Sequence, residues 1–142
     1  MSGTVGFKAP EVFLKVGKND DGSYDNSKVD VFSAAVTAIA IHSGTSPFYC
    51  RDDEDNFKVD LETYNMLRDD KYDAFWEKAA NVPWDPKPDY SEKFKKLIWD
   101  MLKYDPKDRI TAEETFERTC AHKWNKFYRA HNEACLKPII EE

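Results

Sequence analysis

Apolar residues cover nearly the whole circumference of the stretch between Ser27 and Gly44 when it is drawn as a helix. They are Val29, Val31, Phe32, Ala34, Ala35, Val36, Ala38, Ile39, Ala40 and Ile41. A helix that is apolar all round is buried all round, in a protein core or in a membrane. The stretch is shorter than the ~18 residues of a membrane span and contains Asp30 and His42, so we expect a central helix with other helices around it. The β-branched residues leave a strand open, but about fourteen residues between two stop signals is long for a strand.

Both ends of this expected helix carry signals of their own. Ser27 can accept a hydrogen bond from a free backbone N–H group, and Asp30 places a carboxylate three residues later. Gly44 favours the left-handed conformation that ends a helix, and Pro47 cannot continue one. The sequence therefore predicts a helix that Ser27 caps and Gly44 ends.

Elsewhere the apolar residues recur every three to four positions, which predicts further helices. Pro10 favours the first turn of a short helix, with Glu11 in that turn. Ser91 caps a one-sided amphipathic helix. The apolar positions fall into two helical segments broken near residues 69–70, and into the helix after Ser91: Tyr64, Leu67; Tyr72, Phe75, Trp76, Ala79; Phe94, Leu97, Ile98, Met101, Leu102.

The last third of the chain predicts two more helical segments. Thr111 and Glu114 have the spacing of a capping box, which opens a helix with Phe116 facing inward. His122 and Trp124 begin a final helical segment. Trp84 lies in a proline-rich extended connection and is expected to anchor it to the body. The fold class that follows is mainly α, packed around one buried central helix.

The charge of the chain limits its possible partners, and its cysteines bear on its location. The chain has 142 residues, 27 acidic and 21 basic side chains, and a net charge of −6. This balance argues against nucleic-acid binding and against a membrane surface as partner. The three cysteines show no Cys-x-x-Cys spacing, which is typical of reduced thiols in an intracellular compartment. We also find no leader and no transmembrane run, so we expect a cytoplasmic location.

Standard catalytic and metal-binding constellations are missing from the sequence. Gly17-Lys18 lacks the rest of a phosphate-binding loop, and residues 17–26 lack the spacing of a calcium loop. Cys120 and His122 are two potential zinc ligands without partners, and His42 suits a structural role at a helix end. The residues alone therefore indicate no catalytic, cofactor-binding or metal-binding site.

Short motifs along the chain nevertheless resemble one family in the order in which that family carries them. They are Gly3-Thr4 and Phe7 before Ala9-Pro10-Glu11; Asp30, Phe32 and Ser33; Gly44, Pro47 and Phe48; Leu97-Ile98 and Met101-Leu102 before Asp105-Pro106 and Arg109; and His122 with Trp124. Together they resemble a eukaryotic serine/threonine protein kinase, from the end of the activation segment through the helical C-terminal lobe. One such motif is weak; five in order are strong.

The resemblance implies roles for five residues. Glu11 and Arg109 would form the ion pair that ties the Ala-Pro-Glu segment to the far end of the lobe. Asp30 would hold the backbone of the catalytic loop, Thr4 would lie beside the substrate hydroxyl, and Trp124 would be structural. The fold implied is the helical C-terminal part of the large lobe, as a partial kinase-like domain over residues 1–135 with a tail over 136–142.

The same resemblance shows what these 142 residues lack. A kinase needs a glycine-rich loop, a lysine, a catalytic aspartate and metal ligands, and none of these motifs is in the sequence. Phe32, Ala35 and Phe7 replace the usual tryptophan, glycine and tyrosine. Two readings stay open: an inactive interaction or structural module, or a fragment of an active kinase. We expect no bound ATP or magnesium unless the N-terminal half is supplied, and a protein partner or second copy over the surface which that half would cover.

Overall fold

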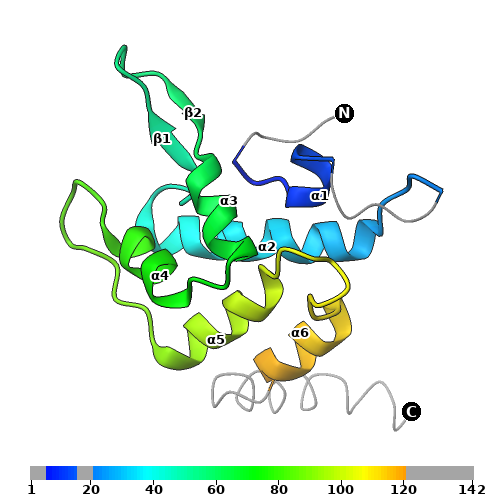
Figure 1. The fold of residues 1–142 in the computed structure, drawn as a ribbon. Helices are drawn as coiled ribbons and strands as arrows, with labels where there is room; N and C mark the ends of the chain where they lie inside the picture. The colour runs from blue at the N-terminus through cyan, green and yellow to red at the C-terminus, as the bar shows by residue number, and fades with distance from the viewer. Residues whose placement is uncertain (1–5, 16–20, 121–142) are drawn as a thin grey trace, which may run out of the picture.

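Six helices and one small hairpin make up the part of the chain that the computed structural model describes, residues 6–15 and 21–120 (Figure 1). The elements are α1 (Pro10–Phe13), α2 (Asn26–Ser43), β1 (Tyr49–Arg51), β2 (Phe57–Val59), α3 (Leu61–Arg68), α4 (Tyr72–Ala80), α5 (Glu92–Met101) and α6 (Ala112–Cys120). Helix α2 runs through the middle, with the other helices around it and the hairpin projecting from the body. The expected mainly helical fold is confirmed.

The residue that caps α2 is Asp25, not Ser27. The Asp25 carboxylate accepts hydrogen bonds from the N–H groups of Ser27 (3.0 Å) and Lys28 (3.3 Å), so the helix begins at Asn26. Because this carboxylate satisfies the free donors of the first turn, the Ser27 hydroxyl is not needed there. The predicted end is confirmed, since Gly44 has φ +85° and its N–H donates to the carbonyl of Ala40 at 2.8 Å.

One face of α2 is exposed, so the expectation of burial on every side is wrong. Asp30, Ala34, Thr37 and Ile41 are all exposed, and the Ile41 side chain reaches 78% exposure. Their spacing of three or four residues places them on one line along the helix. We call these four residues the α2 stripe. The opposite face is buried as expected, through Val31, Phe32, Ala35, Val36 and Ile39.

Packed aromatic rings form the core between α2, α3 and α4. Phe32, Phe48, Tyr64 and Phe75 are fully buried. The ring centroids of Phe48 and Tyr64 are 4.5 Å apart, and Phe48 lies 5.6 Å from Phe32 and 6.2 Å from Phe75. Such contacts add to the large apolar area that each ring buries. The core thus fixes α3 and α4 against the inner face of α2.

The predicted helices around α2 are present, with one error of orientation. The two segments before the proline-rich connection are α3 and α4, separated at Asp69–Lys71, and the Ser91 hydroxyl caps α5 by accepting the N–H of Phe94 at 3.2 Å. The Thr111 hydroxyl caps α6 by accepting the N–H of Glu114 at 3.0 Å. Phe116 does not face inward, because its side chain is 66% exposed. Helix α6 packs against α2 and α5 with another of its sides, where Arg118 pairs with Asp100 of α5.

The hairpin was not expected from the sequence. Its strands are antiparallel, with Tyr49 opposite Val59 and Arg51 opposite Phe57. Residues 52–55, the expected acidic loop, form its tip, where the Asp52 carboxylate accepts the N–H groups of Glu54 and Asn56, each at 2.9 Å. The following lie outside what is described: Thr4, residues 17–20 of the 17–26 loop, the side chain of Cys120, His122, Trp124 and the boundary at residue 135.

Candidate functional site

Residues 6–9 form an irregular segment of turn and bends that three side-chain hydroxyls hold against the body. The Ser46 hydroxyl donates to the carbonyl of Gly6 at 2.6 Å, Ser33 to that of Phe7 at 2.9 Å, and Tyr64 to that of Lys8 at 2.7 Å. We call Ser33, Ser46 and Tyr64 the hydroxyl clasp. Its members come from α2, from the connection after α2 and from α3, so three parts of the fold position one short segment.

Burial keeps the Tyr64 hydroxyl of the clasp protonated, so that it can donate its hydrogen bond. Tyr64 is fully buried, and burial raises the pKa of its hydroxyl well above the usual range for tyrosine. The phenol therefore keeps its proton, and can donate, at pH values at which an exposed tyrosine would already lose it. Ser46 is also buried, and its oxygen in addition accepts the N–H of Phe48 at 3.2 Å.

Glycine is required where the segment meets the hairpin. Gly6 has φ +89°, and a Cβ atom there would lie 2.5 Å from Cε1 of Tyr49. The Tyr49 ring in turn meets the ring of Phe7 edge-on, with centroids 6.2 Å apart. A shallow cavity of about 280 Å³ lies beside them, lined in part by Phe7, Tyr49 and Phe57. The segment is thus the floor of a small apolar depression at the base of the hairpin.

A buried ion pair follows directly after this segment. Arg109 and Glu11 are each 1% exposed, and the two guanidinium nitrogens Nη1 and Nη2 contact Oε1 and Oε2 at 2.7 and 3.0 Å. Arg109 also donates from Nη1 to the carbonyl of Lys28 at 2.8 Å, and from Nε and Nη2 to that of Lys103 at 3.0 and 2.8 Å. All five N–H bonds of the guanidinium therefore have acceptors.

This ion pair joins three parts of the chain that are far apart in sequence. Glu11 belongs to α1, Lys28 to the first turn of α2, and Lys103 to the turn after α5. The structure brings Glu11 and Arg109 together as the sequence motifs led us to expect. The Arg109 guanidinium also lies 5.1 Å from the ring centroid of Phe32, so the pair sits on the aromatic core.

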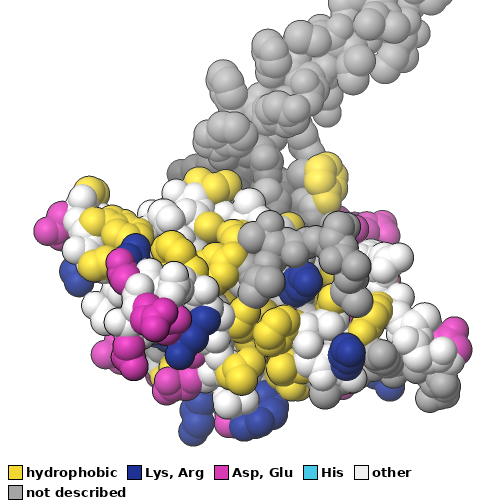
Figure 2. Space-filling view, turned by 90° about the horizontal axis from the view of Figure 1, so that it is seen from above, with side chains coloured by type: hydrophobic (Ala, Val, Ile, Leu, Met, Phe, Trp, Pro, Cys, Tyr) yellow, Lys and Arg dark blue, Asp and Glu magenta, His cyan; other side chains and the backbone are white. Residues whose placement is uncertain are grey.

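Asp30 takes no part in the hydrogen bonds around the Glu11–Arg109 pair. It belongs to the exposed α2 stripe and makes no hydrogen bond or ion pair with any residue that the structure describes. No described element packs on Ala34, Thr37 or Ile41 beside it. Figure 2 shows hydrophobic side chains in the middle of the face seen from above, with acidic side chains toward its edges.

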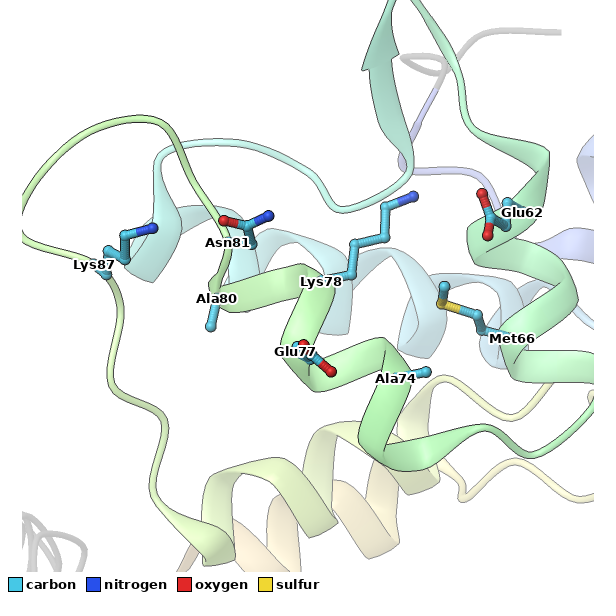
Figure 3. A pocket seen from close by; sticks show the side chains of 8 residues that line it. All are labelled: Glu62, Met66, Ala74, Glu77, Lys78, Ala80, Asn81 and Lys87. Carbon is cyan, nitrogen blue, oxygen red and sulfur yellow. The ribbon is translucent and has the colours of Figure 1, made fainter.

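A broad groove lies between α3 and α4 (Figure 3). Its volume is about 760 Å³, and Glu62 and Met66 of α3 face Lys78 of α4 across it. Lys78 is already paired with Asp60. The groove holds carboxylates and amines but no nucleophile with an adjacent base, so it offers recognition and no evident chemistry.

Among the residues that the structure describes there is no group of three or more His, Cys, Asp or Glu side chains that could hold a metal. Asp30, the carboxylate that the motifs singled out, stands alone on the α2 stripe. Within the same residues, no helix is both long and apolar enough to cross a membrane.

Helices packed around one central helix, a clasped segment before a short helix and a buried Glu–Arg pair define the helical lobe of a protein kinase. The model of the protein kinase domain matches residues 1–124, and the chain belongs to this family. Its relatives are serine/threonine kinases, and the chain corresponds to the C-terminal lobe. No solved structure gives a significant match.

The relatives are much longer than this chain. Calcium-dependent protein kinase 19 of Arabidopsis thaliana is 31% identical over 137 residues, which are 96% of this chain and 19% of that protein. The calcium/calmodulin-dependent protein kinase cmkA of Emericella nidulans is 28% identical over 98% of this chain and 27% of its own length. The phosphorylase b kinase gamma catalytic chain of Bos taurus is 26% identical over 82% of this chain and 25% of its own length. The chain thus spans about a fifth to a quarter of these relatives.

Sequence reasoning missed the hydroxyl clasp. Ser33 stands inside the apolar run of α2, and Ser46 lies between Gly44 and Phe48, where small polar residues are out of keeping with burial. A buried hydroxyl requires a hydrogen-bond partner, so these two positions carried a signal for a nearby backbone segment. Which segment it was could not be read from the spacing.

Proposed function

We propose that this chain is a kinase-derived helical module that serves as an interaction or structural subunit and transfers no phosphate by itself. The observation that carries the proposal is the α2 stripe, an uncovered line along the central helix of an otherwise packed lobe. The absence of nucleotide-binding motifs from these 142 residues supports it.

The α2 stripe needs a cover of protein. Burying a side chain such as Ile41 stabilises a complex by roughly 1.5–3 kcal/mol, and Ala34 and Thr37 extend the same line. A protein partner or a second copy of this chain would provide an apolar surface of matching length. The net charge of −6 disfavours nucleic acid and membrane lipid as that cover. We place this role in the cytoplasm.

A titration with ATP and magnesium tests the proposed lack of catalysis. We expect the unfolding temperature of the purified chain to stay constant as ATP·Mg is added, because ligands that bind only the folded state raise it. A saturable rise in the unfolding temperature would contradict the proposal. A known intact kinase domain, run in the same plate, serves as the positive control.

The second candidate is a segment of a longer, active protein serine/threonine kinase. The observation that favours it is the length of the relatives, which extend far beyond the region matched here. In that case the α2 stripe and Asp30 would be covered by the preceding part of the same chain, and Thr4 would lie on the substrate side. Sequencing the transcript upstream of Met1 separates the two, because this candidate requires His-Arg-Asp and Asp-Phe-Gly motifs to be encoded there in frame.

A further inference from the structure

A second cavity lies between the hairpin and the proline-rich connection after α4. Its volume is about 560 Å³, within the range of sites that take up a large side chain or a small ligand. The hairpin contributes Cys50, Arg51 and Phe57 to its lining, and the connection contributes Val82, Pro83 and Trp84. We call it the hairpin groove. None of the residues of the α2 stripe lines it.

Two exposed aromatic rings line the groove, one from each side. Trp84 is 42% exposed, yet its indole N–H donates to the carbonyl of Ser43 at 2.9 Å and its ring lies against Gly44. Phe57 is 62% exposed, with its ring centroid 5.6 Å from that of Tyr49. Both rings are therefore held in place while leaving apolar surface uncovered, which is typical of a preformed binding site.

The charges beside the groove are unbalanced toward the acidic side. Arg51 is neutralised by Asp55, whose two carboxylate oxygens lie 2.7 and 2.8 Å from Nη1, and Lys78 is paired with Asp60. Residues 49–60 carry five acidic and two basic side chains. The carboxylates of Asp53 and Glu54 at the tip are exposed and have no ion-pair partner among the described residues.

Backbone hydrogen bonds favour the charged form of one carboxyl group at the tip, that of Asp52. Hydrogen bonds from the backbone N–H of Asn56 lower the pKa of the Asp52 carboxyl below its usual value. The two strands hold the tip at a fixed direction from the groove, because Tyr49 pairs with Val59 and Arg51 with Phe57. An extended chain rises about 3.3 Å per residue, and the tip lies about three residues beyond the groove.

We propose that the hairpin groove binds an extended peptide segment of a partner protein, with a large apolar side chain between Phe57 and Trp84 and lysine or arginine about three residues away, opposite the acidic tip. The apolar side chain displaces water from the two rings, and the basic residues face Asp53 and Glu54. This proposal rests on the proposed function as an interaction module. It specifies one class of partner for that module, at a surface separate from the α2 stripe.

Fluorescence anisotropy with the full 142-residue chain tests this assignment. The probe is the fluorescein-labelled peptide Lys-Lys-Gly-Ser-Phe-Ser-Gly-Lys-Lys. The comparison peptides replace the phenylalanine by serine, or all four lysines by glutamate. We expect saturable binding of the first peptide below about 1 mM and at least tenfold weaker binding of both others. Added salt should weaken the binding, since exposed charges are screened.

Matched variants of the protein locate the binding. Phe57→Ser and the pair Asp53→Lys with Glu54→Lys should each weaken binding about tenfold. These side chains are exposed, so we expect the variants to fold like the unmodified chain, which circular dichroism checks. The control pair Glu113→Lys with Glu117→Lys makes the same charge change on the exposed side of α6 and should leave affinity within about twofold.

Three results would overturn the proposal. They are no saturable binding, equal binding of the lysine and glutamate peptides, or equal weakening by the α6 control pair. Sedimentation velocity without peptide tests the other occupant: self-association that Phe57→Ser abolishes would assign the groove to a second copy instead. The proposed lack of catalysis fails only through ATP binding, which none of these experiments measures, so the two failures are distinguishable.

Discussion

Replacing Arg109 by alanine removes the guanidinium that joins α1, the start of α2 and the turn after α5. The change leaves the Glu11 carboxylate buried without its partner and leaves the carbonyls of Lys28 and Lys103 without their donors. Breaking a buried pair by removing one partner costs roughly 3–5 kcal/mol. The lost carbonyl hydrogen bonds act in the same direction, so we expect Arg109→Ala to fall at the upper end of that range.

Urea denaturation followed by circular dichroism measures this loss. For a domain of this size each kcal/mol corresponds to roughly 3–4 °C in unfolding temperature, so a loss near 5 kcal/mol should lower it by about 15–20 °C in a thermal scan. Arg51→Ala is the matched control, because the Arg51–Asp55 pair is exposed and should contribute less than about 1 kcal/mol. Arg109→Lys keeps the charge but not the bidentate geometry, and should recover only part of the loss.

A double-mutant cycle separates the pair from the other contacts of Arg109. If Glu11→Gln and Arg109→Ala each destabilise strongly and the double variant costs little more than either, the two side chains act as one unit. The reasoning would be refuted by an Arg109→Ala variant that unfolds within about 1 kcal/mol of the unmodified chain.

Three further changes test other parts of the structure. Asp25→Ala should cost about 1 kcal/mol of unfolding free energy and Ser27→Ala less than half of that, by urea denaturation, because Asp25 is the cap; the reverse order would restore Ser27 to that role. Ser46→Ala should cost about 1–2 kcal/mol and speed hydrogen exchange in residues 6–9, because the buried carbonyl of Gly6 loses its donor; unchanged exchange there would argue against the clasp. Ile41→Ser should leave the unfolding temperature within about 2 °C, because the side chain is exposed. The same change should weaken association with a partner or a second copy, measured over a series of protein concentrations. A large drop in stability would mean that the α2 stripe is covered within the chain.

Local signals in the sequence were enough for most helices. Ser91 and the Thr111–Glu114 box each lie at a helix start because capping depends on residues three positions apart. Gly44 ends α2 for an equally local reason. The contact of Glu11 with Arg109 spans most of the chain, and only the resemblance to a family motif made it predictable.

Features that depend on distant contacts were not predictable in this way. The strands of the hairpin have three residues each, too few for an alternating pattern to stand out. Phe116 was assigned inward from its apolar character, whereas the side of α6 that meets the body is set by its packing against α2 and α5, which are distant in sequence. The apolar composition of α2 predicted burial on all sides because it shows only what the helix is able to bury. Among the described residues, the neighbouring elements leave the α2 stripe exposed.

Light scattering on a size-exclusion column, with circular dichroism on the same peak, tests the central claim most directly. The claim is that this chain is a folded interaction module held together by the clasp and the Glu11–Arg109 pair. It predicts a helical, monodisperse monomer or defined dimer. An aggregated or largely unfolded sample would contradict it, because the lobe would then need further protein to complete its fold.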